Sequence, residues 1–415
     1  MSSTRAAGAA PALAQRSELF STSGTARARA AAKAAAASGQ EIIDLSAGEI
    51  WADFPDAVRE GALAAITKGV SRYTDTIGLL PLRAAIAQRL SEDSGQRWEA
   101  EEIAVTAGAK QALFNTAMLL FDPGSEVIIP RPYWTTFPAQ VALAGAKPVF
   151  VDSAASGYVP RPDLIEACLS ARTRAIIINT PNNPTGAVYD RSCLRGLAEI
   201  ALKHRLWIIL DSCYAGFIHE PGGAEHLLAV VPEVRPLTVV VNAFSKQLAM
   251  TGWRLGYMAA PARLVGAVKA LQSHTTSNPN VIAQHAVLNY LRQGDRAYER
   301  ELQDLLLENR RQGLEILSRL EQVRAARAQG GFYFYLDVSP LLTVKGSRFQ
   351  DAEAVAAQLL TSTGVATVPG SAFGDLSGLR LSYGLPTDDL KRALTRVVTA
   401  LNAIGRSPAL LRAAQ

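Results

Sequence analysis

Short apolar runs alternate with helical patterns along most of the chain, and this alternation constrains the fold more than any other feature. β-Branched or aliphatic runs of strand length occur at residues 102–108, 125–130, 147–152, 175–179, 206–211 and 237–245. Helical stretches such as LRAAIAQRLSED at 82–93 separate most of them. Unbroken apolar strands between helices are typical of a mostly parallel sheet that is covered on both faces. The sequence therefore predicts an α/β fold, while the order of its strands stays open.

The pattern changes after about residue 285, where long helical stretches replace the alternation. Two further strand patterns, GFYFYLD and LRLSYG, and a final helical stretch then follow. We expect an N-terminal arm and part of a small domain at 1–60, a large domain at 61–295, and a C-terminal small domain at 296–415. The smaller α+β domain would thus be built from both chain ends. Gly, Pro and Gln interrupt the first 16 residues, so we expect an ordinary flexible or helical arm rather than a targeting signal.

Composition and charge exclude several classes of protein. With 48% hydrophobic and 19% charged residues, the chain is neither disordered nor collagen-like. No apolar run reaches the ~18 residues of a spanning helix, so we expect no membrane partner and a cytoplasmic protein. The net charge of +5 comes from dispersed basic residues, which disfavours nucleic-acid binding and suits small anionic substrates. The three cysteines lack zinc-ligand or disulfide spacing, so no metal site is expected.

Polar or helix-starting residues follow four of the strand patterns. Asp211 ends the run at 206–211, Asn183 follows the run at 175–179, and Lys246 follows the run at 237–245. Residues 109–110 open a helix directly after the run at 102–108. Because parallel α/β sheets hold their sites at the carboxyl ends of strands, these positions together predict a binding site.

The residue types at these positions suit a pyridoxal-phosphate pocket. A lysine at a strand end, with Arg254 eight residues beyond Lys246, fits a Schiff-base lysine beside an anion clamp. Asp211 on a neighbouring strand would keep a pyridinium nitrogen protonated, which makes the ring an electron sink. Asn183 and Tyr214 can hydrogen-bond a ring phenolate, and Trp134 offers a flat aromatic face. The helix that starts at Ala109 and Lys110 would receive the phosphate at its N-terminus.

In these residues and in the motifs around them, the chain resembles the class I aminotransferases of the aspartate aminotransferase type, in their bacterial aspartate/prephenate-like branch. The resemblance runs from about residue 20 to 403. It implies pyridoxal-phosphate fold type I, with a mostly parallel seven-stranded sheet between helices in the large domain and a smaller α+β domain. The motifs that carry it, in family order, are YTDTIGLLPLR, VTAGAKQALFN, PYWTTFP, NTPNNPTGAVY, DSCY, SKQLAMTGWRLGY, TTSNPNVIAQ, GGFYFY and LRLSYG.

The resemblance implies a role for each cofactor-side position. Lys246 resembles the lysine that bonds pyridoxal 5'-phosphate and moves the substrate proton, and Asp211 and Tyr214 complete the implied catalytic set. Tyr73 would reach the phosphate from the neighbouring subunit, which implies a homodimer with shared active sites. The other implied contacts are Asn183 and Tyr214 with the ring oxygen, Trp134 with the ring face, and Arg254, Ser245, and the N–H groups of Ala109 and Lys110 with the phosphate.

Arg380 resembles the arginine that clamps the substrate α-carboxylate, for which a planar bidentate fork is suited. The Lys110 ammonium lies at a predicted helix N-terminus, which favours an anion, and its position matches one that this branch uses for a distal carboxylate. We therefore expect an L-amino acid, aspartate or glutamate, and 2-oxoglutarate as partners in a ping-pong cycle. The implied substrate-binding positions are Arg380, Gly48, Lys110, Trp134, Asn183 and Thr25.

Three departures from the family pattern leave alternatives open. The usual Asp-Glu-x-Tyr motif has Ser212 and Cys213 at its two middle positions, so its glutamate is lost. Ala243 stands where many relatives have a serine, and GEIWADF replaces the usual Gly-Glu-Pro-x-Phe motif. One alternative is an enzyme of the same fold that diverts the carbanion to elimination, cyclisation or oxidation in a specialised pathway. A further alternative is that Lys110 serves the phosphate through its backbone alone. A DNA-binding regulator is disfavoured, because residues 1–60 are too few and too Ala-rich for the required domain.

Overall fold

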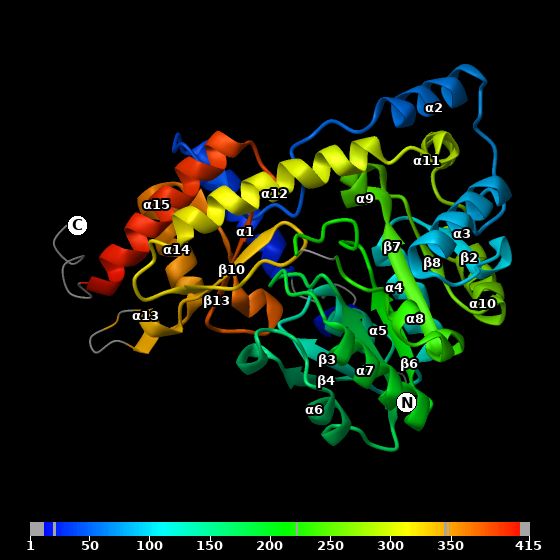
Figure 1. Ribbon diagram of the computed structural model, residues 1–415, viewed down its shortest axis with the longest axis horizontal. Helices are drawn as coiled ribbons and strands as arrows, with labels where there is room; N and C mark the ends of the chain where they lie inside the picture. Colours follow the sequence, from blue (N-terminus) through cyan, green and yellow to red (C-terminus); the bar gives the residue numbers. More distant parts are fainter. Residues whose placement is uncertain (1–11, 20–21, 221–222, 344–346, 348, 407–415) are drawn as a thin grey trace, which may run out of the picture.

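The strands of a seven-stranded sheet form the centre of the large domain in the computed structural model, which describes residues 12–19, 22–220, 223–343, 347 and 349–406 (Figure 1). The strand order is β2-β8-β7-β6-β5-β3-β4. β8 runs antiparallel to both of its neighbours, and the other strands run parallel, as the sequence predicted for most of the sheet. The bounds are β2 (Ile103–Thr106), β3 (Glu126–Arg131), β4 (Lys147–Asp152), β5 (Thr173–Asn179), β6 (Trp207–Asp211), β7 (Thr238–Ala243) and β8 (Gly256–Ala259).

The β-branched composition of these strands reflects burial on both faces of the sheet. Successive side chains of a strand point to opposite faces, so a strand between two helix layers must be apolar throughout. Ile177 and Ile209 belong to one hydrophobic core. Ile176, Ile178 and Ile208 belong to the core on the other face. The continuous apolar runs in the sequence are therefore explained by two cores that sandwich one sheet.

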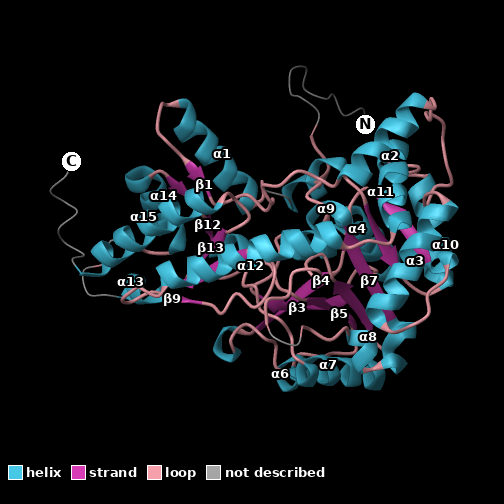
Figure 2. Cartoon of the chain, turned by 45° about the horizontal axis from the view of Figure 1, so that its top comes forward, coloured by secondary structure: helices cyan, strands magenta, loops and turns pink. Residues whose placement is uncertain are grey.

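Helices lie on both sides of this sheet, with α7 and α8 along one side (Figure 2). No helix among the described residues is long and apolar enough to cross a membrane. The helices of this part of the chain are α2 (Asp56–Thr67), α3 (Leu80–Ser94), α4 (Ala109–Leu120), α5 (Thr136–Leu143), α6 (Pro162–Ala167), α7 (Arg191–His204), α8 (Leu227–Val230), α9 (Phe244–Gln247), α10 (Ala262–Ser273) and α11 (Val281–Gln293). Short 3-10 turns are η1 (Gln15–Leu19), η2 (Ala100–Glu102), η3 (Ala154–Ser156), η4 (Pro232–Leu237), η5 (Thr251–Trp253) and η6 (Gly370–Phe373).

Described segments from the N-terminal and C-terminal parts of the sequence meet in the smaller group of elements, which Figure 1 shows as blue segments among orange and red ones. Two-residue strands from the two ends pair in parallel, with Ile43 opposite Val365. A separate sheet has the order β12-β13-β10-β9 and antiparallel pairing. The elements are β1 (Ile43–Asp44), β9 (Arg324–Ala325), β10 (Tyr333–Asp337), β11 (Val365–Ala366), β12 (Val368–Pro369), β13 (Gly378–Ser382), α1 (Gly24–Ala37), α12 (Ala297–Leu317), α13 (Ser339–Thr343), α14 (Ala352–Thr363) and α15 (Thr387–Arg406).

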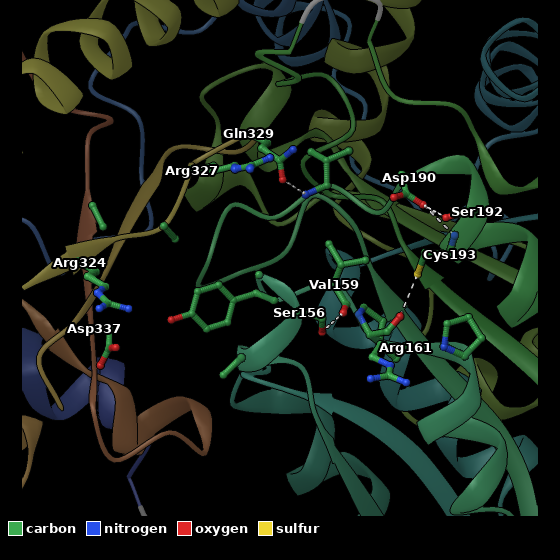
Figure 3. Close-up of a pocket in the computed structure, with 18 residues that line it drawn as sticks. Ser156, Val159, Arg161, Asp190, Ser192, Cys193, Arg324, Arg327, Gln329 and Asp337 are labelled. Atoms are coloured by element: carbon green, nitrogen blue, oxygen red, sulfur yellow. Dashed lines mark hydrogen bonds between the residues drawn. The ribbon is translucent and has the colours of Figure 1, made fainter. Parts of the chain in front are cut away.

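A cleft of about 980 Å³ separates the loop after β4 and the start of α7 from the segment around β9 (Figure 3). Arg324 and Arg327 lie on one wall, and Ser156, Arg161 and Asp190 lie on the other. None of the site residues predicted from the sequence lines this cleft. The domain limits at 60 and 295 stay a prediction, and residues 1–11 of the predicted arm lie outside the described residues.

Candidate active site

A cavity of about 120 Å³ lies where the strands of the large sheet end. β6 ends at Asp211, and β7 leads into the single turn of α9 that carries Lys246. Every predicted cofactor-binding residue except Tyr73 lines this cavity. The full lining is Ala109, Lys110, Trp134, Asn179, Asn183, Asp211, Cys213, Tyr214, Ala243, Ser245, Lys246 and Arg254.

Lys246 is held in the cavity with its ammonium group next to the loop that precedes α2. Its Nζ donates a hydrogen bond to the carbonyl oxygen of Gly48. Burial lowers the pKa of Lys246 from 10.5 to about 8, and the positive charges of Arg380 and Arg254 act in the same direction. A lysine with a pKa near neutrality can act as both base and acid at working pH.

Asp211 is a buried carboxyl group without a cationic partner in the described part of the chain. It is 3% exposed, and no lysine or arginine among the described residues forms an ion pair with it. Its Oδ1 accepts a hydrogen bond from the backbone N–H of Cys213 at 3.1 Å, and burial raises the pKa of Asp211. A protonated ring nitrogen in the cavity would supply the positive charge that this carboxylate lacks.

Arg380 brings the smaller sheet into contact with this cavity. It is 2% exposed on β13, and its Nη1 donates to Asn183 Oδ1 at 3.0 Å while its Nη2 donates to the carbonyl oxygen of Ser46 at 2.8 Å. Its buried Nε has no hydrogen-bond partner among the described residues. An unpaired buried donor is costly, so this N–H suits an incoming carboxylate.

The first turn of α4 and Arg254 form an anion cradle. Gly108 precedes the helix with a φ of 80°, and the N–H groups of Ala109 and Lys110 in the first turn have no acceptor within the helix. A Cβ built on Gly108 would lie 2.8 Å from Arg254 Nη2, so only glycine lets the guanidinium approach the helix start. Ser245 also lines the cavity. Free amides at a helix N-terminus beside an arginine fit the phosphate of pyridoxal 5'-phosphate.

Lys110 and Trp134 lie together on the cavity wall. The Lys110 Nζ is 5.2 Å from the centre of the Trp134 ring. Burial, and then the charge of Arg254, lower the pKa of Lys110. The Trp134 ring meets Phe137 edge-on, with 5.6 Å between the ring centres, so the indole is fixed from one side. The Lys110 cation is thus placed beside a flat aromatic surface in the same cavity as Lys246.

Four predicted residues are not part of the cavity lining: Arg380 and Gly48 lie next to it, hydrogen-bonded to Asn183 and Lys246, and Tyr73 and Thr25 lie apart from it. Tyr73 is 89% exposed, and Thr25 lies at the start of α1 with its hydroxyl 3.2 Å from Ser23 Oγ. Sequence reasoning missed Asn179, whose Oδ1 accepts from the Asn183 N–H at 3.0 Å, and Tyr333, whose hydroxyl is 3.0 Å from that of Tyr214. Asn179 ends a predicted strand and could have been found by its place, whereas Tyr333 depends on how two distant strands pair.

The chain is similar to known proteins along most of its length. The family model described as aminotransferase class I and II matches residues 40–397. The chain is 36% identical over 401 residues to the aspartate/prephenate aminotransferase of Thermus thermophilus, and the aligned region covers 94% of this chain and 98% of that protein. It is 37% identical over 396 residues to the aspartate aminotransferase of Geobacillus stearothermophilus, which covers 93% and 98%. The aspartate aminotransferase structure from Rhizobium meliloti has a TM-score of 0.90 at 34% identity and covers 95% of this chain and 99% of that one.

Proposed function

The chain belongs to the aminotransferase class I and II family, and we propose that it transfers the amino group of aspartate or glutamate to 2-oxoglutarate in a ping-pong cycle. It is an aminotransferase that depends on pyridoxal phosphate. Amino donor, acceptor and order of steps are our proposal, and the placement of Lys110 in the cavity of Lys246 is the observation that carries the choice of donor.

Bound pyridoxal phosphate supplies an electron sink that acidifies the substrate Cα–H bond. Lys246 then takes up and returns the Cα proton, for which its lowered pKa is suited. Asp211 would hold the proton on the ring nitrogen, because its buried carboxylate forms no ion pair with a lysine or arginine of the described residues. Asn183 and Tyr214 would donate hydrogen bonds toward the ring oxygen, and the start of α4 and Arg254 would hold the phosphate.

Arg380 binds the substrate α-carboxylate in this proposal. Its guanidinium is fixed on one side by Asn183 and Ser46, and its unpartnered Nε supports a role as a carboxylate donor. Gly48 lies over the same space, because its carbonyl oxygen accepts a hydrogen bond from Lys246. The α-carbon of a bound amino acid would thus be held near the lysine that moves its proton.

A second carboxylate on the substrate would meet the Lys110 ammonium. The positive end of the α4 dipole and Arg254 reinforce the positive potential around this lysine. Relatives named aspartate or aspartate/prephenate aminotransferases support the same substrate class. We place Thr25 at the substrate side as well, from the resemblance alone, since its hydroxyl lies on α1 outside the cavity lining.

We further propose a cytoplasmic homodimer in which Tyr73 reaches the neighbouring cavity. Tyr73 is 89% exposed, and other large apolar side chains of the same region are also exposed. Exposed apolar side chains that are this close in sequence favour a protein partner, and a second copy would cover them. The exposed apolar residues before, within and after α2 are Trp51, Leu63, Ile66 and Leu80.

The absorption spectrum of the holoenzyme tests the proposed reaction. L-Aspartate added without an oxo acid should remove the visible cofactor band and release one equivalent of oxaloacetate per site, and 2-oxoglutarate should restore the band. The Lys246→Ala variant, which keeps the Arg380 clamp, should show neither change. A band that persists while product accumulates would support the diverted carbanion chemistry instead. A response to another amino acid but not to aspartate would refute the dicarboxylate donor.

A further inference from the structure

Tyr333 contacts three parts of the active site although no part of the proposed function uses it. It begins β10, is 1% exposed, and lies outside the cavity lining. We propose that Tyr333 is a positioning residue that links the carboxylate clamp to the hydrogen bond at the cofactor ring oxygen. The inference rests on the proposed roles of Arg380 and Tyr214, and it concerns how the two are held.

The first contact joins Tyr333 to Tyr214 through their hydroxyl groups, 3.0 Å apart. Geometry alone lets either hydroxyl donate. When Tyr214 donates its only O–H hydrogen toward the ring oxygen, Tyr333 must be the donor to Tyr214. A hydroxyl that accepts a hydrogen bond donates a stronger one, so Tyr333 strengthens the contact that Tyr214 makes.

The second contact joins Tyr333 to Arg380. The guanidinium carbon lies 4.4 Å from the centre of the Tyr333 ring. Pairing of β10 with β13 sets this distance, because Tyr335 is opposite Arg380 and Tyr333 is opposite Ser382, which makes Tyr333 and Arg380 diagonal neighbours. Arg380 also donates to Asn183. Each proposed partner of the ring oxygen is therefore tied to the clamp, Asn183 directly and Tyr214 through Tyr333.

The third contact is with the loop that covers the cavity. A Cβ built on Gly48 would lie 2.9 Å from the Tyr333 hydroxyl oxygen, so the hydroxyl fills the space that a side chain would need. The carbonyl oxygen of the same glycine accepts a hydrogen bond from Lys246. The Tyr333 hydroxyl thus sets how closely the loop at Gly48, which accepts the hydrogen bond from Lys246, packs against β10.

Both phenols keep their protons near neutral pH. Donation from Tyr333 to Tyr214, and from Tyr214 to the ring oxygen, requires this. Burial raises the pKa of Tyr214 and the pKa of Tyr333. The charged or titratable groups that act on this pair are Arg380, Cys213 and Glu49. Of these, Arg380 lowers the pKa of each phenol, but this effect is smaller than that of burial.

The Tyr333→Phe holoenzyme tests the first contact because it loses only the hydroxyl. Weaker donation by Tyr214 should raise the midpoint of the pH titration of the visible cofactor band by about 0.3 unit. Tyr335→Phe is the matched control, since Tyr335 is equally buried on the same strand but donates to Asp375 at 2.7 Å. Its titration midpoint should equal that of the wild type.

A double-mutant cycle separates positioning from general packing. In a Tyr214→Phe background, Tyr333→Phe should add no further shift of the midpoint. Tyr333→Leu also removes the ring and should raise the KM of amino donors about ten-fold, whereas Tyr333→Phe should raise it less than three-fold. A wild-type midpoint in Tyr333→Phe, or a double variant whose shift is the sum of the single shifts, would overturn the proposal. The band titration uses no amino donor, so failure of aspartate as substrate leaves this test intact.

Discussion

The buried amine of Lys246 should make cofactor attachment rise with pH around pH 8. Burial lowers the pKa of this group from 10.5 to about 8, a difference of about 2.5 units or about 3 kcal/mol. Only the neutral amine can attack a carbonyl group. At pH 7 the neutral fraction would be about 10%, roughly 300-fold above that of a lysine with its ordinary pKa. Attachment should become ten-fold faster per pH unit below pH 8 and level off above it.

Stopped-flow absorbance after mixing cofactor-free protein with pyridoxal phosphate, from pH 6 to pH 10, measures this rate. The same cofactor with a free lysine derivative is the control, because it shows the contribution of the cofactor's own ionisations. Glu49→Gln should move the midpoint to lower pH, since the negative charge of Glu49 raises the pKa of Lys246. A normalised midpoint at or above pH 10 would refute the burial argument.

Three further experiments have expected outcomes. Lys110→Ser should raise the KM of dicarboxylic amino donors at least ten-fold and hardly change that of aromatic donors, and equal effects would refute the distal-carboxylate role. Gly313→Ala should destabilise the protein by about 1–3 kcal/mol in urea titrations, because its Cβ would lie 2.3 Å from a Phe334 ring atom. Gly266→Ala is the control, since α10 has open space at this position, and it should stabilise the protein by up to about 1 kcal/mol. The reverse order of the two stabilities would contradict this packing. Mixing Tyr73→Phe with Lys246→Ala subunits should restore dimers with one intact site if Tyr73 crosses between subunits, and no recovery of activity would refute sharing.

The sequence predicted the strands of the large sheet well where β-branched residues mark them, as at 175–179 and 206–211. It did not mark β8, because Gly256–Ala259 contains no β-branched residue and lies within a motif that was interpreted for its chemistry. The antiparallel direction of β8 and the strand order depend on which strands pair, and local patterns do not contain that information. Burial between neighbours makes β8 a strand despite its weak propensity.

For the site, sequence position predicted the residues that follow strands, because parallel strands bring their carboxyl ends together. Lys246, Asp211 and Asn183 were found in this way, and they line one cavity. Tyr333 was not found, because its contact with Tyr214 joins the strand β10 to the loop after β6. The open Nε of Arg380 was equally inaccessible, since it depends on where Asn183 and Ser46 lie.

The parallel pair of β1 and β11 has a consequence for synthesis on the ribosome. Ile43 emerges early, but its partner Val365 is translated only near the end of the chain. The large sheet from β2 to β8 is continuous in sequence and can form while translation proceeds. During that interval the apolar residues before α2 have no partner and are exposed to chaperones. A chain that ends before residue 365 cannot form the β1–β11 pair. Its N-terminal segment should therefore be the first part to be degraded after release.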